Sequence, residues 1–141
     1  MTRQEAIAFF SRRQQAYDLH NASALASDHT VDGVVRSPLF PRVEGMAEIE
    51  QSYRGLFSVF PDWQIAFDDP IVDGPRVAQP FVARATHVGE LMGLAGTGRR
   101  VEIRGALIHR MRDGKIAEEQ RIYDFTSLLM QIGVLRVKAA R

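Results

Sequence analysis

The stretch from Thr86 to Phe125 decides the fold of this chain of 141 residues. It starts with Thr-His-Val-Gly-Glu-Leu-Met-Gly-Leu-Ala-Gly-Thr-Gly-Arg-Arg-Val-Glu-Ile-Arg-Gly and, from Met111, ends with Met-Arg-Asp-Gly-Lys-Ile-Ala-Glu-Glu-Gln-Arg-Ile-Tyr-Asp-Phe. The pattern predicts a strand end, a glycine-rich crossover, a long strand, a tight turn at Asp113-Gly114 and a return strand. An antiparallel hairpin therefore dominates the second half of the chain.

Composition indicates an ordinary globular chain. Apolar residues make up 45% of the sequence and charged residues 25%, both typical of globular domains. A net charge of +1 gives no electrostatic basis for binding nucleic acid or an anionic membrane. The chain has no cysteine, and Met-Thr-Arg-Gln-Glu at its start lacks the apolar core of a secretory signal, so we expect a cytoplasmic protein. We expect residues 1–141 to form a single domain.

Helical spacing dominates the first half of the sequence. Thr2 and Glu5 have the spacing of a capping box, which places a helix start there. Apolar residues that recur every three or four positions predict helices up to about residue 19, over 22–27, over 46–60 and over 126–132. Pro61 should end the third of these helices and Gly133 should cap the last. The basic tail, 136–141, is expected to be loose.

Strand spacing dominates the remainder. Strands are expected over 31–37, over 63–67 and over 76–87, followed by the two strands of the hairpin. Residues 37–44 contain two prolines and are expected to form a loop. Pro80 cannot donate to a ladder, so it should lie at a sheet edge or a bulge. This order predicts an α+β fold with helices packed on one face of a curved, mostly antiparallel sheet.

The register of the last hairpin decides which side chains share a face. A loop of Asp113-Gly114 alone would place Gly105 opposite Ile122. A loop of three residues with a bulge at Gly114 would place Gly105 opposite Arg121. We prefer the bulged register, in which one face carries Ile103, Gly105, Leu107, Glu119, Arg121 and Tyr123.

Five short segments resemble the signature of the SnoaL-like polyketide cyclases, also called ester cyclases, a branch of the nuclear-transport-factor-like superfamily. They are Phe60-Pro61-Asp62, the segment 86–90, the segment 97–101, the segment 112–116 and Gln131-Ile132-Gly133. The resemblance implies a cone-shaped sheet wrapped around N-terminal helices, a single small-molecule pocket, no cofactor and a homodimer. It also favours the bulged register, because the family points the matching positions into its pocket.

The sequence departs from this family at the residues that carry its chemistry. The characterised polyketide cyclases use an inward aspartate, three residues before the final Asp-Phe, as the acid/base group. Arg121 occupies that position here. The glutamine and histidine that assist the aspartate correspond to Gly105 and Leu107. Because arginine does not release its proton at neutral pH, the family's aldol mechanism lacks its base at that position.

Several residues are candidates for a site, each with a structural alternative. Arg121, Glu119, Asp124 and Tyr17 are the candidate catalytic residues, although Asp124 is more typical of a helix N-cap. Glu119 and Arg121 could pair inside the pocket or form a solvated rim. The candidate ligand-binding residues are Arg36, Phe57, Trp63, His87, Ile103, Gly105, Leu107 and Tyr123. Arg36 could instead be a surface residue, Phe57 part of the core and His87 a structural hydrogen-bonding group. His20, His29 and His109 do not have metal-ligand spacing, so no metal is expected.

Two classes of function fit these residues. One is a cofactor-independent enzyme that cyclises, isomerises or dehydrates a polyketide-like or other oxygenated apolar substrate by proton transfer. The other is a binding module that keeps the pocket without the chemistry. A pocket carboxylate with a raised pKa would favour the enzyme, and an apolar cavity whose only charges are paired would favour the binding module.

Overall fold

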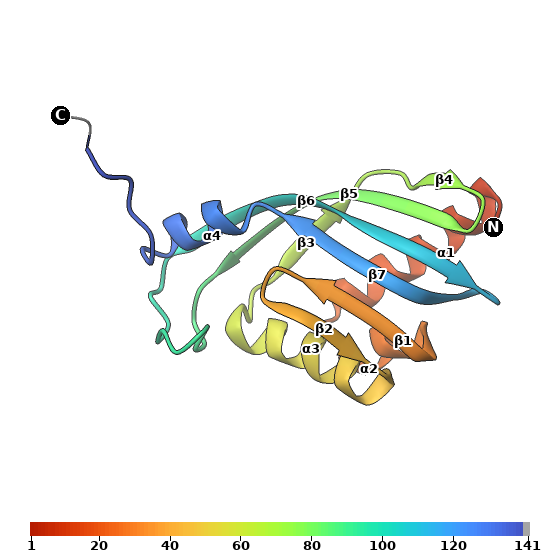
Figure 1. The fold of residues 1–141 in the computed structure, drawn as a ribbon, viewed down its shortest axis with the longest axis horizontal. Coiled ribbons are helices and arrows are strands. Elements are labelled where there is room, and N and C mark those ends of the chain that lie inside the picture. The colour runs from red at the N-terminus through yellow and green to blue at the C-terminus, as the bar shows by residue number, and fades with distance from the viewer. Residues whose placement is uncertain (140–141) are drawn as a thin grey trace.

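A computed structural model describes residues 1–139 of the chain. Seven strands form one curled, unclosed sheet in the order β2-β1-β7-β6-β5-β3, and β4 pairs with β5 (Figure 1). The helices are α1 (Arg3–Asp18), α2 (Ala22–Ser27), α3 (Met46–Val59) and α4 (Phe125–Gln131). The strands are β1 (His29–Ser37), β2 (Phe40–Glu44), β3 (Gln64–Phe67), β4 (Ile71–Asp73), β5 (Arg76–Thr86), β6 (Arg100–Arg112) and β7 (Lys115–Tyr123).

The α+β fold predicted from the sequence is confirmed. The sheet is antiparallel except between β1 and β7, and it curls around α1, α2 and α3 (Figure 1). Along β5 and β6 buried and more exposed residues alternate, so one face of the sheet packs on the helices and forms the core. Among the described residues, no helix is long and apolar enough to cross a membrane.

Local sequence rules account for the helices. Thr2 and Glu5 form the predicted capping box, with the Thr2 hydroxyl accepting from the Glu5 amide at 3.1 Å. The α3 helix ends before Pro61, as predicted. Gly133 follows α4 with a φ of +85°, the left-handed conformation expected after a helix end. Residues 135–139 have no regular structure, and the last two residues of the predicted tail lie outside the described part.

The prediction of a loop over residues 37–44 is wrong, because Phe40–Glu44 forms β2. This strand pairs only with β1 and therefore lies at the edge of the sheet. An edge strand leaves every second backbone amide without a ladder partner, so Pro41 is tolerated there. The turn after β1 and the start of β2 bring Leu39 and Phe40 to the interior, where they pack against the core cluster.

Pro80 lies within a central strand, so the edge prediction is wrong for β5 as a whole. The pairing of β5 with β6 continues through Pro80 and Ala106 without a bulge. On the other side of β5 the partner changes from β4 to β3, and the Asp68 amide donates to the Pro80 carbonyl at 2.9 Å. Pro80 has no backbone N–H, and it lies between the residues of β5 that pair with β4 and those that pair with β3, so no ladder hydrogen bond is lost there.

The observed register of the last hairpin differs from both predictions. The loop is Asp113-Gly114, both residues have positive φ, and Arg112 faces Lys115. The ladder then shifts between Arg110 and Met111, because β7 has an extra residue opposite that point. Beyond the shift, Gly105 lies opposite Tyr123, and Leu107 lies opposite Arg121.

The predicted face survives this shift, but Gly105 lies opposite Tyr123 and not opposite Arg121. Both the preferred register and the observed one pair odd-numbered residues with odd-numbered residues, so the same side chains share a face. A Cβ on Gly105 would stand 2.0 Å from the Ile122 carbonyl oxygen and 2.9 Å from the Tyr123 Cβ. Gly105 therefore allows β6 and β7 to approach each other.

Candidate functional site

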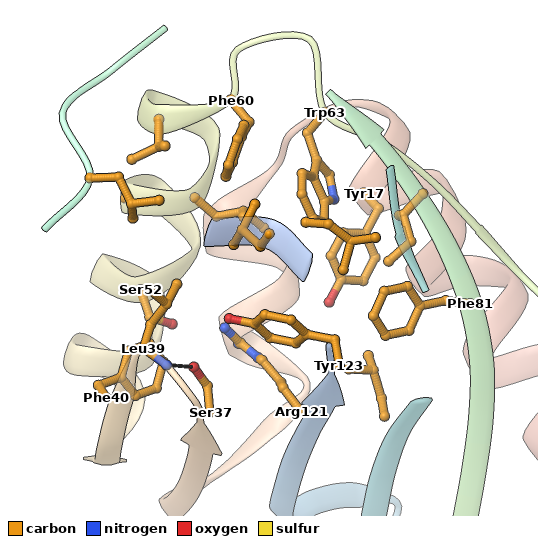
Figure 2. A pocket seen from close by; sticks show the side chains of 18 residues that line it. Tyr17, Ser37, Leu39, Phe40, Ser52, Phe60, Trp63, Phe81, Arg121 and Tyr123 are labelled. Atoms are coloured by element: carbon orange, nitrogen blue, oxygen red, sulfur yellow. Dashed lines mark hydrogen bonds between the residues drawn. The ribbon is translucent and has the colours of Figure 1, made fainter. Parts of the chain in front are cut away.

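A cavity of about 310 Å³ lies between α3 and the inner face of the sheet (Figure 2). This volume is at the small end of the range for ligand pockets. Residues from α1, α3, α4 and six strands line it, together with the turn after β1, the segment before β3 and the crossover between β5 and β6. The lining residues are Tyr17, Ser37, Leu39, Phe40, Ser52, Gly55, Leu56, Val59, Phe60, Trp63, Ile65, Phe81, Leu91, Ile103, Leu107, Arg121, Tyr123 and Leu128.

The cavity wall is apolar with a few hydrogen-bond donors. Among the described residues, no aspartate, glutamate or histidine lines it. Burial raises the pKa of Tyr17 well above its usual value, and burial also raises the pKa of Tyr123. Both hydroxyls therefore stay protonated and can donate. Arg121 carries the charge in the cavity wall, and Figure 2 shows its guanidinium among the lining side chains.

Arg121 is held from behind by a buried carboxylate. Its Nε donates to Glu119 Oε2 at 2.8 Å, and the Glu119 side chain is 0% exposed. The guanidinium lies over the Tyr53 ring, with 4.9 Å from its carbon to the ring centroid. Arg121 Nη2 is buried and has no partner among residues 1–139. The side chain is thus fixed at one edge and keeps unused donors at the other.

Glu119 connects Arg121 to a second buried arginine. Arg13, on α1, lies 3.9 Å from Glu119 Oε1 and donates to Asp28 Oδ2 at 3.0 Å. It also donates to the Leu25 carbonyl and the Tyr53 hydroxyl, both at 2.9 Å. Arg13 and Asp28 are almost fully buried. Two positive and two negative charges therefore lie together in the core and balance each other.

Two buried histidines complete this cluster. His109 Nδ1 lies 3.4 Å from Glu119 Oε1, and His29 Nε2 lies 3.2 Å from the Tyr53 hydroxyl. Burial lowers the pKa of His109 to about 4 and of His29 to about 3, in each case against the opposing effect of Glu119. Both are therefore neutral near pH 7. Burial alone would raise the pKa of Glu119, but Arg121 and the other nearby cationic groups hold it below its usual range.

Six of the residues predicted for the site line the cavity: Tyr17, Trp63, Ile103, Leu107, Arg121 and Tyr123. Glu119 lies behind Arg121 as its partner and does not line the cavity. Arg36 is exposed and lines a neighbouring hollow of about 400 Å³, which shares Ser37, Arg121 and Tyr123 with the cavity.

The other predicted site residues have structural positions. Asp124 is exposed and caps α4, accepting from the Ser127 amide at 2.9 Å, which is the N-cap alternative. His87 is buried at the end of β5, where its Nδ1 accepts from the Thr97 amide at 3.3 Å and fastens the crossover. Phe57 stacks on His20, with the ring centroids 4.4 Å apart. None of these three, nor Gly105, lines the cavity.

The sequence reasoning missed the buried charges. Arg13 follows Phe10 by three positions and precedes Tyr17 by four, so it lies on the predicted apolar face of α1. This spacing could have identified it. No local pattern marked Asp28 or His109, whose burial depends on contacts between distant segments. Among the described residues, no group of three or more acidic or histidine side chains could hold a metal ion.

Comparison with known proteins identifies the family of this chain. The family model described as SnoaL-like polyketide cyclase matches residues 9–132. The chain belongs to the SnoaL-like polyketide cyclase family. Among curated proteins none matches the sequence.

Solved structures of the SnoaL-like type share the fold. AclR from Streptomyces galilaeus, a proposed hydroxylase, is 27% identical over 96% of this chain and 89% of its own, with a TM-score of 0.83. IdmH from Streptomyces antibioticus, a proposed polyketide cyclase, is 27% identical over 95% of this chain and 100% of its own, with a TM-score of 0.72. A protein from Catenulispora acidiphila with a ketosteroid isomerase-like fold is 17% identical over 90% of this chain and 93% of its own, with a TM-score of 0.77.

Proposed function

We propose that this SnoaL-like protein takes a small, mostly apolar, oxygenated molecule into the cavity and holds an oxygen of that molecule with Arg121. The observation that carries the proposal is a cavity with an apolar wall, donors at Arg121, Tyr17 and Tyr123, and no carboxylate in its lining. Donors in a lining without a carboxylate among the described residues suit a ligand that brings acceptor atoms. Arg121 is the only charged residue that residues 1–139 contribute to the lining, and it is already paired with Glu119, which favours binding over proton abstraction by a carboxylate.

Filling the cavity should abolish uptake of a neutral apolar dye such as N-phenyl-1-naphthylamine. Val59 is half-buried and lines the cavity, so Val59→Trp should weaken dye binding about tenfold or more by occupying the ligand's volume. Fluorescence titration measures the affinity. Val31→Trp is the control, because Val31 is 78% exposed and does not line the cavity. Equal affinities for both variants would disprove binding in this cavity.

A cofactor-independent enzyme is the second candidate, favoured by family membership and by two donors in one cavity. Arg121 and the protonated Tyr17 would donate to a substrate carbonyl and stabilise the enolate oxygen that forms when solvent water takes the α-proton, and the protonated water would return a proton to the product. The expected result is that Arg121→Met, combined with Glu119→Gln so that no carboxylate is stranded, lowers kcat at least about 100-fold on a polyketide-like ketone. Tyr17→Phe should lower kcat while KM changes little. Recovery of every ketone unchanged from the wild-type protein would leave the binding function.

We also propose that the outer face of the sheet forms a homodimer. The register places Ala106 beside Pro80 and Ile122, and Ile108 beside Ala78, so the apolar side chains are contiguous. The described C-terminal residues extend away from the sheet and do not cover it (Figure 1). A second subunit would bury this face.

Sedimentation should show a species of about twice the chain mass of 15.8 kDa at micromolar concentration. Ile108→Glu should convert it to a monomer, because a charge on the apolar face opposes burial. Leu19→Glu is the control, since Leu19 is 78% exposed at the end of α1. A wild-type monomer would reject the dimer. The cytoplasmic location and the single-domain organisation stay predictions.

A further inference from the structure

Glu119 neutralises Arg121 before any ligand arrives, and this determines which oxygen the cavity can accept. The distance from Arg121 Nε to Glu119 Oε2 is 2.8 Å, and the carboxylate is fully buried. Arg13 is the other arginine near Glu119, and it is already paired with Asp28. The four buried charges sum to zero, and Arg12, the second arginine on Asp28, has a side chain that is 54% exposed and hydrated. No buried positive charge therefore remains for an anionic ligand to neutralise.

An anionic ligand would therefore bring an unbalanced charge into a buried site. A carboxylate on the free edge of the guanidinium would meet Glu119 bound to the Nε side of the same group, and the two like charges would repel each other. It would also lose its hydration to an apolar wall. A carbonyl oxygen accepts a hydrogen bond from the same donor without the repulsion from Glu119, and it loses much less hydration free energy than a carboxylate.

The remaining donors fit the same kind of ligand. Arg121 Nη2 is buried without a partner among residues 1–139, and a neutral acceptor would satisfy a donor of this group. The Tyr17 hydroxyl points into the cavity in Figure 2, and it donates to a carbonyl oxygen as readily as to an anion. Aromatic rings of Phe40, Phe60, Trp63 and Phe81 form much of the wall and suit a flat, unsaturated ligand.

We infer that the cavity selects an uncharged oxygen acceptor, such as a ketone, ester or quinone carbonyl, over a carboxylate of the same shape, because Glu119 already matches the charge of Arg121. This inference rests on the proposed binding function and specifies its ligand class. Glu119 acts through Arg121 and is a positioning and specificity residue, since it does not line the cavity.

Three naphthalene derivatives of equal size and shape test the inference. 2-Acetylnaphthalene presents a carbonyl, 2-naphthoate presents a carboxylate, and 2-isopropenylnaphthalene presents no acceptor. Equilibrium dialysis at neutral pH measures the affinity of the wild-type protein for each. We expect the ketone to bind at least tenfold more tightly than the carboxylate and more tightly than the hydrocarbon.

The variant Glu119→Gln should reverse the order of ketone and carboxylate. Glutamine keeps the size of the side chain and an oxygen that accepts from Arg121 Nε, but it removes the balancing charge. The carboxylate should then bind more tightly than the ketone, a change that a merely structural role of Glu119 would not produce. Arg12 lies outside the cavity with a side chain that is 54% exposed, so Arg12→Gln should leave the ranking unchanged.

The wild-type ranking decides the inference even if Glu119→Gln fails to fold. A carboxylate that binds as tightly as the ketone, or a hydrocarbon that does so, would overturn it while the proposed binding function stands. A folded Glu119→Gln protein that keeps the wild-type ranking would also overturn it. Failure of all three probes to bind, together with failure of the neutral dye, would overturn the proposed function and the inference with it.

Discussion

Replacing Arg13 by alanine should lower the free energy of unfolding by about 3–5 kcal/mol, the usual effect of removing one partner from a buried ion pair. The Arg13 side chain is 2% exposed and binds Asp28, the Leu25 carbonyl and the Tyr53 hydroxyl. Its loss would leave Asp28 with only one arginine partner and would leave Glu119 with Arg121 alone. Urea denaturation followed by circular dichroism measures the change.

Arg12 provides a matched control on the same carboxylate. It is adjacent in sequence and bonds to Asp28 Oδ1 at 2.8 Å, but its side chain is 54% exposed. The Arg12 guanidinium is largely hydrated and Asp28 keeps Arg13 as a buried partner, so Arg12→Ala should cost clearly less than Arg13→Ala. If both variants lost a similar free energy of unfolding, burial of the Arg13–Asp28 pair would not determine how much this pair stabilises the protein.

The sequence predicted those elements whose determinants are local. The α3 helix follows from its repeated apolar spacing and ends at Pro61, and the last turn follows from Asp113-Gly114. The strand β2 was missed because Pro38 and Pro41 are typical of loops. Proline argues against a strand only where the strand has partners on both sides. Whether a strand lies at the edge of a sheet depends on the whole fold and cannot be predicted from the local sequence.

In the candidate site, too, the sequence predicted only the features whose determinants are local. Alternation along β7 was enough to place Arg121 and Glu119 on one face, because a shift of two positions in register leaves the face unchanged. The residue that lies opposite Arg121 on β6 could not be predicted, because no local sequence pattern marks the extra residue in β7. The role of Glu119 also needed the structure, because its second cationic neighbour, Arg13, comes from α1, which is distant in sequence.

Acid should unfold this protein well above the pH at which its carboxylates titrate. His109 has a pKa of about 4 in the folded protein and His29 a pKa of about 3, whereas unfolded histidine titrates near 6.5. Below about pH 6.5 the unfolded chain therefore binds protons that the folded protein does not bind. The free energy of unfolding should fall by about 1.4 kcal/mol per pH unit for each histidine as the pH drops from about 6.5 toward about 4.

Glu119 adds to this loss at lower pH. Burial opposes its charge, but Arg121 holds its folded pKa below the usual value, so the stability that it contributes is present above about pH 4.5 and is lost as the pH falls further. Urea denaturation at several pH values between 7 and 4.5 measures the slope, which approaches about two protons between pH 6 and 5. His109→Gln should remove about one of these protons, because the glutamine side chain does not titrate. A free energy of unfolding that is constant from pH 7 to 5 would show that the two histidines are not buried in the neutral form.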